Sequence, residues 1–322
     1  MKVDYSMILS PRNRDLPLNL QALSGGLPRT ELEIGFGNGE FTVKHAAAHP
    51  DTFVIGMEVS PSCVTRCVRR ASAAESSSVA NLAVVCTDAR YMMKELFADA
   101  SLDRVRMNFP CPWPKTRHAR RRVTASEFAA DLAAVLKLDG IFELVTDEEW
   151  YALDARETLG RHEALAFADY EINPLRPVTT KYERKWLEQG KSIYRLTVTK
   201  TKAFTVARET WGFSWKDEKG EEMHIKTGKP LPEKGLGFLF DASGARGEAR
   251  WVFKKHYTAP GGTKNFLIET VSADDEFEQR YYLKAVERDG DTLIKLDGTA
   301  KVYLTPAVRF AVEDLGRRLS EA

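Results

Sequence analysis

Short apolar segments alternate with helical patterns through the first half of the chain, and this alternation limits the possible folds more than any other feature. The apolar segments are TELEIGF (30–36), DTFVIGMEV (51–59), LAVVCTDA (82–89), LDRVRMNF (102–109) and GIFELVTD (140–147). Helical patterns fall at roughly 39–48, 60–76, 90–97, 124–137 and 148–160. Strands that alternate with helices form parallel sheets whose two faces the helices cover. We therefore predict an α/β fold with an open, mostly parallel sheet.

The pattern changes after about residue 200. Later segments are short, aromatic or β-branched and interrupted by Gly and Pro, and only about 306–320 keeps a helical period. We therefore predict an α/β domain over residues 1–202 and a smaller, β-rich domain over residues 203–322.

The first apolar segment ends in a glycine-rich loop, LEIGFGNG at 32–39. Gly35, Gly37 and Gly39 permit a tight turn and a close approach of a ligand to the backbone. Their spacing is GxGxG, whereas dinucleotide sites have GxGxxG. Glu33, two residues before the first glycine, suits a cationic sulfonium with a free amino group better than a pyrophosphate. The loop therefore favours S-adenosylmethionine over a nicotinamide dinucleotide.

Carboxylates also follow the next two apolar segments. Glu58 stands where nucleotide-binding α/β folds place an acid that accepts hydrogen bonds from ribose hydroxyls. Asp88 ends the third segment, where the adenine end of the cofactor would lie. The glycines alone are compatible with a simple strand-to-helix turn, but three acids at successive strand ends favour a cofactor site.

The fourth apolar segment leads into a stiff, basic loop, FPCPWPKTRHARRR at 109–122. Trp113 offers a face on which a base can stack. The loop then carries five cations, Lys115, Arg117, Arg120, Arg121 and Arg122. Such a run is often only a solvated surface, but loops after strands border ligand sites in open α/β sheets. We therefore interpret it as a contact for RNA phosphates.

Two later segments complete the pattern. Asp147 ends the fifth apolar segment, at another carboxyl-end position. The segment RPVTTKYE at 176–183 has Thr180 and Glu183 at capping-box spacing, which by itself indicates a linker followed by a capped helix.

Together these segments resemble the tRNA (guanine-N7)-methyltransferase family, whose members have a Rossmann-like class I methyltransferase fold. The family's LEIGxGxG, GIE, FPDPWxKxRHxKRR, TD and TxFE elements correspond here to LEIGFGNG (32–39), GMEV (56–59), FPCPWPKTRHARRR (109–122), TDEEWY (146–151) and TKYE (180–183). The resemblance spans about residues 28–200 and does not cover 203–322. The match is most specific in the basic loop.

The resemblance implies methyl transfer from S-adenosylmethionine to N7 of a guanine in the variable loop of tRNA. Residues 1–202 would then form the methyltransferase domain. Cofactor contacts are expected at the glycine loop, Glu33, Glu58 and Asp88. Substrate contacts are expected at the five cations of the basic loop and at Asp147, Thr180, Lys181, Tyr182 and Glu183.

The main departure from the family is Cys111, which stands where the family has a catalytic or guanine-positioning aspartate; Pro114 also replaces a histidine. Guanine N7 carries a free lone pair, so methyl transfer needs alignment rather than a general base. A thiol is a poor hydrogen-bond acceptor, so its main effect would be weaker recognition of the base.

Three interpretations of Cys111 follow. It is a tolerated change, with Asp147 or Asn108 holding the base; or the enzyme acts on another base or RNA; or the protein is a catalytically impaired RNA-binding homologue. Cys111 and Asp147 are the candidate catalytic residues. A methyltransferase of a small molecule or protein, with the basic loop as a solvated surface, is a further alternative.

Composition adds exclusions. The formal net charge is only +1, from 47 basic and 46 acidic residues, but phosphate binding requires a local basic surface rather than a basic whole. No apolar run approaches the roughly 18 residues of a membrane span, and no signal peptide is recognisable, so we expect a cytoplasmic protein without a membrane partner. The four cysteines lack the spacing of a metal site. The sequence is compatible with a monomer or a homodimer.

The aromatic and basic residues of 203–322 allow two interpretations. They could form a stacking surface for RNA, although aromatics at strand spacing more often belong to a core, which we expect for most of them. The residues concerned are Trp211, Trp215, Trp251, Lys254, Lys255, His256, Tyr257, Tyr281 and Tyr282. We expect the domain to extend the contact with RNA.

Overall fold

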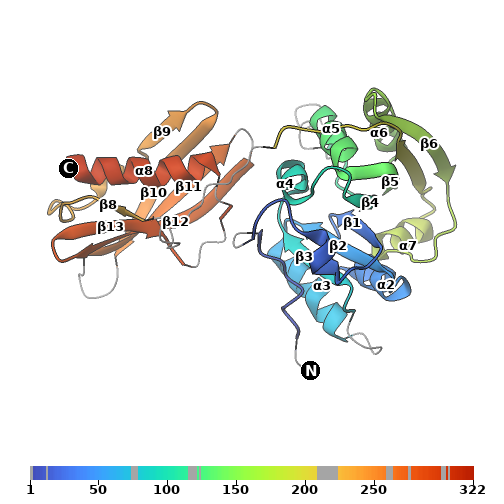
Figure 1. Cartoon of the computed structure of the whole chain (residues 1–322), viewed down its shortest axis with the longest axis horizontal. Coiled ribbons are helices and arrows are strands. Elements are labelled where there is room, and N and C mark those ends of the chain that lie inside the picture. Colours follow the sequence, from blue (N-terminus) through green and yellow to red (C-terminus); the bar gives the residue numbers. More distant parts are fainter. Residues whose placement is uncertain are drawn as a thin grey trace. The chain divides into compact units, whose positions relative to one another are not determined.

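The computed structural model describes residues 3–11, 14–73, 79–114, 122, 125–208, 224–258, 264–274, 277–298, 302–303 and 305–322. The chain divides into two compact units, Met1–Glu209 and Thr210–Ala322, and Figure 1 shows the elements of each. The division falls a few residues after 202 because Arg208 is fastened to the first unit. Its guanidinium donates to the carbonyl of Lys94 at 2.8 Å and to the carboxylate of Asp99 at 2.6 Å.

The first unit is built on a seven-stranded sheet with the order β3-β2-β1-β4-β5-β7-β6. Its strands are β1 (Arg29–Ile34), β2 (Thr52–Glu58), β3 (Leu82–Cys86), β4 (Leu102–Asn108), β5 (Leu136–Thr146), β6 (Leu165–Ile172) and β7 (Tyr194–Lys200). Strands β1 to β5 pair in parallel, whereas β7 is antiparallel to both β5 and β6. The predicted mostly parallel sheet is confirmed.

Helices cover both faces of this sheet. The helices of this unit are α1 (Leu20–Ser24), α2 (Glu40–Ala48), α3 (Pro61–Ala73), α4 (Ala89–Leu96), α5 (Ser126–Val135), α6 (Glu149–Gly160) and α7 (Lys181–Glu188). Helices α2 and α3 pack together on one side, and α4, α5 and α6 pack on the other (Figure 1). The helices between the predicted strands therefore lie where a doubly covered sheet requires them.

Strands β6 and β7 were not among the predicted strands. In β6 only Leu165 is buried, so the strand lacks the continuous apolar run that marked β1 to β5. In β7 buried and half-buried residues alternate, with Thr197 between Leu196 and Val198. Both strands lack a continuous apolar run, so neither has the sequence pattern of a strand that is buried on both faces.

The second unit is a six-stranded antiparallel sheet with one long helix. The strands are β8 (Ile225–Lys226), β9 (Ser243–Arg246), β10 (Ala249–Thr258), β11 (Asn265–Asp274), β12 (Phe277–Arg288) and β13 (Asp291–Leu296), in the order β8-β13-β12-β11-β10-β9. A single 3-10 turn, η3 (Gly237–Leu239), precedes β9, and α8 (Pro306–Glu321) ends the chain. The β-rich character and the final helix agree with the prediction for residues 203–322.

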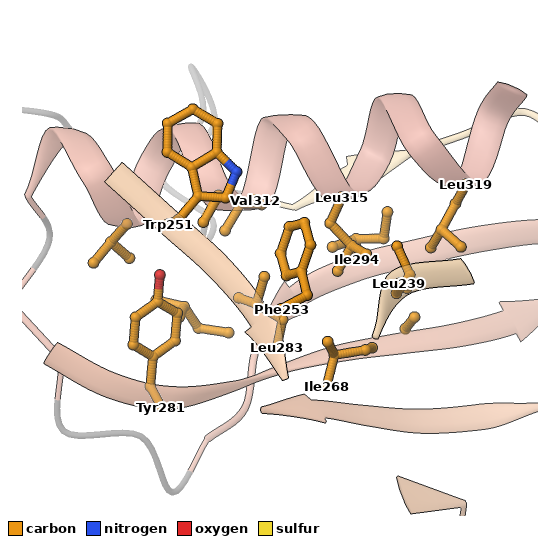
Figure 2. Close-up of a cluster of buried hydrophobic side chains, with 14 of the residues drawn as sticks. Leu239, Trp251, Phe253, Ile268, Tyr281, Leu283, Ile294, Val312, Leu315 and Leu319 are labelled. Carbon is orange, nitrogen blue, oxygen red and sulfur yellow. The ribbon is translucent and has the colours of Figure 1, made fainter. Parts of the chain in front are cut away.

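The core of the second unit lies between α8 and one face of the sheet. Phe253, Leu283 and Ile294 from three strands point toward Leu315 and Leu319 of α8 (Figure 2). Trp251 and Tyr281, 8% and 3% exposed, belong to the same core. The expectation that most of the aromatics are core residues is thus confirmed for these two. Among the described helices of both units, none is long and apolar enough to cross a membrane.

Candidate cofactor and substrate site

The glycine loop between β1 and α2 needs glycine for two different reasons. Gly35 and Gly37 have φ of 72° and 56°, in the left-handed region, and a Cβ at either would meet nothing within 4 Å. Gly39 has φ of 73°, and a Cβ there would lie 2.8 Å from the Cα of Cys67 in α3. The last glycine therefore lets α2 approach α3, while the first two leave the outer side of the loop open to a ligand.

Glu58, at the end of β2, holds this loop in place. One carboxylate oxygen accepts a hydrogen bond from the backbone N–H of Gly37 at 3.0 Å. The other oxygen accepts from the backbone N–H of Ser60, also at 3.0 Å. The predicted acid thus lies beside the glycine loop, and each oxygen keeps a further lone pair for a ligand.

Asp88 is the N-cap of α4. Its Oδ1 accepts from the backbone N–H of Arg90 at 3.0 Å, and its Oδ2 accepts from the Arg90 guanidinium at 2.6 Å. The side chain is therefore oriented by α4, at the carboxyl end of β3.

Glu33, near the end of β1, is buried. The residue is 4% exposed, and its two oxygens accept from Thr42 Oγ1 at 2.6 Å and from Asn108 Nδ2 at 2.9 Å. Burial raises the pKa of the Glu33 carboxyl, although these hydrogen bonds and the charges of Arg106 and Arg176 oppose the shift. The carboxylate is thus held in one orientation by neighbours from α2 and β4.

Asn108 continues this connection toward α7. Its Oδ1 accepts from Arg176 Nη2 at 2.5 Å, and Arg176 Nη1 donates to Glu183 Oε2 at 2.6 Å. The Arg176 and Glu183 side chains are only 4% and 3% exposed. We call Glu33, Asn108, Arg176 and Glu183 the polar chain; it joins the ends of β1 and β4 to the first turn of α7. No local pattern in the sequence indicates a role for Arg176, because Asn108 is 68 positions away along the chain.

The first turn of α7 has the predicted capping box. Thr180 Oγ1 accepts from the backbone N–H of Glu183 at 3.0 Å, and Glu183 Oε2 accepts from the backbone N–H of Thr180 at 3.2 Å. Between them, Tyr182 is 58% exposed, and the Lys181 side chain lies outside the described residues. Glu183 is therefore fixed by Arg176 and by its own helix, whereas Tyr182 faces solvent.

Asp147, at the end of β5, contacts the segment that follows α7. Its Oδ2 accepts from Lys191 Nζ at 2.6 Å, and the same ammonium lies 4.0 Å from the ring centroid of Trp186. The hydrogen bond that Lys191 donates to Asp147 raises the pKa of Lys191. The two ends of α7 are thus tied to the ends of β4 and β5.

The loop after β4 begins with strained backbone. Phe109 and Trp113 have φ of 52° and 46°, which non-glycine residues seldom adopt. Between them, Cys111 is exposed and forms no disulfide. Strain of this kind is common where a loop must present groups to a ligand.

Arg122 anchors the far end of this loop. Its guanidinium donates to the carbonyl of Trp113 at 3.3 Å and to Asp154 at 3.2 Å, and lies 5.0 Å from the Trp150 ring centroid. Arg122 therefore helps to shape the loop. Lys115, Arg117, Arg120 and Arg121 lie outside the described residues.

An ionic cluster joins β1, α2 and β4. Glu31 of β1 accepts from His45 of α2 at 2.7 Å and pairs with Arg106 of β4. Burial alone would raise the pKa of Glu31, but the hydrogen bond from His45 and the charge of Arg106 lower it to about 2. The described residues contain no group of three His, Cys, Asp or Glu side chains able to hold a metal ion.

Comparisons with known proteins show which family this chain is similar to. Residues 29–196 match a protein family described as putative methyltransferase. A tRNA (guanine-N(7)-)-methyltransferase from Thermotoga maritima is 35% identical over 97% of this chain and 96% of its own length. The protein of the same name from Coprothermobacter proteolyticus is 27% identical over 98% of this chain and 94% of its own.

Other relatives match a smaller part of this chain. The protein of that name from Klebsiella pneumoniae is 35% identical over 58% of this chain and 79% of its own length. Among solved structures, the antibiotic-resistance methyltransferase Kmr matches with a TM-score of 0.44 and 19% identity, over 57% of this chain and 92% of that one.

Proposed function

Because the chain belongs to the tRNA (guanine-N7)-methyltransferase family, we propose roles for its residues in transferring a methyl group from S-adenosylmethionine to N7 of guanine in tRNA. One structural observation supports these roles above all. The polar chain brings the carboxyl ends of β1 and β4 and the first turn of α7 together beside the glycine loop. Ligands of open α/β sheets bind at this edge.

The glycine loop and the three acids fit S-adenosylmethionine. Gly35 and Gly37 leave the outer side of the loop open, so a ligand can approach the backbone there. Glu58 is assigned to the ribose hydroxyls and Asp88 to the adenine end, while Glu33 places negative potential near the amino and sulfonium groups. The bound cofactor supplies an electrophilic methyl group, so the protein itself needs no covalent intermediate.

The residues that bind the substrate have to align guanine with the methyl group. Guanine N7 attacks with a lone pair that is already free, so no side chain has to remove a proton first. The protein must hold the base in line with the methyl group and exclude competing orientations. We assign this contact to Asp147, whose carboxylate lies at the end of β5 and keeps lone pairs beyond its pair with Lys191.

Asn108 is assigned a supporting role instead. Its amide donates to Glu33 and its carbonyl oxygen accepts from Arg176, so both ends of the carboxamide are directed into the polar chain. Glu183 is likewise a positioning residue, because it is buried against Arg176 and Thr180. Of the predicted contacts on α7, we assign direct substrate contact to the exposed Tyr182 and, with it, to Thr180 and Lys181.

Cys111 is an exposed residue of the loop after β4. We interpret it as a tolerated change that weakens recognition of the base without removing the alignment on which the reaction depends. Arg122 shapes the basic loop, and the five cations of that loop are assigned to phosphates of the RNA.

At the level of the whole chain, we assign methyl transfer to the first unit, Met1–Glu209, and additional RNA contact to the second, Thr210–Ala322. A tRNA substrate is most readily met in the cytoplasm, where we place the protein.

A methyl-transfer assay tests these assignments. The full chain is incubated with S-adenosylmethionine labelled in the methyl group and with bulk tRNA, and the labelled nucleoside is identified. We expect 7-methylguanosine, with a higher rate for Cys111→Asp because a carboxylate accepts hydrogen bonds better than a thiol. Label on another base would show a changed specificity. No label from the natural chain, with label restored by Cys111→Asp, would show an impaired enzyme.

The role of Asp147 requires a matched control. Asp147→Asn should raise the KM for tRNA or lower kcat, while Asp169→Asn on β6, whose carboxylate is 52% exposed, should change neither. Equal activity of both variants would remove Asp147 from the site.

A further inference from the structure

The sheet of the second unit has one covered and one open face. In the described part of this unit α8 is the only α-helix, and it covers the face that carries Phe253, Leu283 and Ile294 (Figure 2). Successive residues of a strand point to opposite faces. Residues between these core positions therefore lie on the other face, where no described helix of the unit packs.

Cross-strand register places a row of exposed and half-buried residues along that open face. Tyr257 of β10 is opposite Leu267 of β11, which is opposite Lys284 of β12, which in turn is opposite Lys295 of β13. Lys284 lies between the buried Leu283 and Ala285, and Lys295 between the buried Ile294 and Leu296, so both lysines face away from the core.

Two further residues extend the row. Tyr282, 36% exposed, lies two positions before Lys284 and meets Tyr257, 46% exposed, with ring centroids 6.1 Å apart and an interplanar angle of 69°. Lys226 of β8 is exposed and is opposite Leu293, two positions before Lys295. We call Lys226, Tyr257, Tyr282, Lys284 and Lys295 the tyrosine–lysine face.

This arrangement of lysines does not help to stabilise the folded unit. Lys284 and Lys295 are direct cross-strand neighbours, and like charges in that position repel each other. Neither lysine, nor Lys226, forms an ion pair with any residue that the structure describes, whereas the nearby acid Glu269 is already paired with Arg280 at 3.4 Å. The face therefore has three lysines without an ion pair among the described residues, beside two exposed aromatic rings, while Asp297 lies opposite Tyr282 on the same side of the sheet.

We propose that the tyrosine–lysine face binds a single-stranded segment of the tRNA substrate, with bases against Tyr257 and Tyr282 and phosphates beside the lysines. This inference rests on the proposed function, which supplies an RNA partner. Aromatic rings on an open sheet face stack unpaired bases, and neighbouring cations neutralise the backbone. The row crosses four strands, about 14 Å at the usual strand spacing. A sheet of that width accommodates two or three stacked bases in other RNA-binding modules.

The lysine contacts are tested in the full chain with the double variant Lys284→Ala/Lys295→Ala. We expect the Kd for tRNA to rise about tenfold at moderate salt and the salt slope of log Kd to fall by about 2, one for each lysine. The rate at saturating tRNA should not change, because the reacting groups lie in the other unit. The control is Lys202→Ala/Lys234→Ala, which removes two exposed lysines outside the face and should leave both quantities nearly unchanged.

The stacking contacts are tested with Tyr257→Ala and Tyr282→Ala. Each should raise the Kd for tRNA between about 5-fold and 150-fold, with little change in the salt slope, since stacking involves no counterion release. If the tyrosine and lysine variants bind tRNA as tightly as the natural chain does, the proposal is overturned. Loss of a dimer on Lys284→Ala/Lys295→Ala, with tRNA affinity unchanged, would also overturn it and assign the face to a second copy of the chain.

A measurement on the natural protein avoids any dependence on variants. Acylation of Lys284 and Lys295 by a lysine-selective reagent, read by mass spectrometry, should be suppressed by tRNA, whereas acylation of Lys234 should not. If the natural chain methylates tRNA but these lysines are equally reactive with and without it, the proposed function stands and this inference fails. If tRNA protects the lysines but receives no methyl group, the proposed function fails and this inference stands.

Discussion

Replacing Arg176 by alanine should show that the buried polar chain contributes more to the free energy of unfolding than a surface ion pair nearby. Arg176 donates hydrogen bonds to both Asn108 and Glu183, and it also lies 5.3 Å from the Phe41 ring centroid. Its removal leaves a carboxylate with a 3% exposed side chain without its cation. Breaking a buried ion pair in this way costs about 3–5 kcal/mol.

The lower end of that range is the better expectation here. Glu183 would keep its hydrogen bond from the backbone N–H of Thr180. We therefore expect a loss of about 3 kcal/mol in the free energy of unfolding, equivalent to a fall in Tm of about 6–12 °C for a unit of this size. Chemical denaturation followed by tryptophan fluorescence and a thermal scan would measure both.

The matched control is Arg184→Ala in the same helix. Arg184 is 44% exposed and pairs with Glu40 at 2.8 Å, so its loss should cost no more than about 1 kcal/mol. A cycle with Glu183→Ala adds a second test. The double variant Arg176→Ala/Glu183→Ala should be less destabilised than the sum of the single variants, because it leaves no buried charge unpaired.

Cofactor affinity and kcat provide a further test of the polar chain. Without Arg176 the Asn108 amide keeps only Glu33 as a partner, so affinity for S-adenosylmethionine and kcat should both fall even at temperatures where the variant is folded. Equal stability of Arg176→Ala and Arg184→Ala, together with natural cofactor affinity, would refute the role given to the polar chain.

Three other predictions follow from single contacts. Gly39→Ala should destabilise the first unit by about 1–3 kcal/mol in thermal unfolding, because its Cβ would meet the backbone of Cys67; full stability would contradict that packing. Burial raises the pKa of Asp131 to about 6 from 3.8, despite the charges of Lys94 and Arg208, so its contribution to stability is present below about pH 4 and is lost as pH rises through 6. Asp131→Asn should remove up to about 3 kcal/mol of this pH dependence, measured as the difference in unfolding free energy between pH 4 and 7. Glu58→Gln should weaken S-adenosylmethionine binding about tenfold in calorimetry, since an amide replaces a charged acceptor; unchanged affinity would show that Glu58 only shapes the loop.

The sequence predicted the strands that are buried on both faces. In β2, six of the seven residues from Thr52 are buried, and a run of that kind is recognisable without any knowledge of its neighbours. The edge strand β6 has a single buried residue, so its identity depends on pairing with β7, which no local pattern records.

The site divides in the same way. The glycine loop, Glu58 and the capping box at Thr180 are local features, and the structure describes each at its predicted position. The polar chain is not local, since Arg176 and Asn108 are 68 positions apart and meet only once the sheet has formed. Arg176 was identifiable only as a cation beside a predicted helix start, where it would ordinarily be taken for a solvated residue.

The distribution of thiols gives the protein an intrinsic probe position. Cys67 is fully buried under the glycine loop, and burial raises its pKa to about 12, so it should resist alkylation at neutral pH. Cys63 and Cys86 are half-buried, and only Cys111 is exposed. In a Cys63→Ser/Cys86→Ser background, a maleimide dye would therefore attach at Cys111 alone. Its emission would report arrival of the RNA at the loop after β4 in real time, without any engineered cysteine.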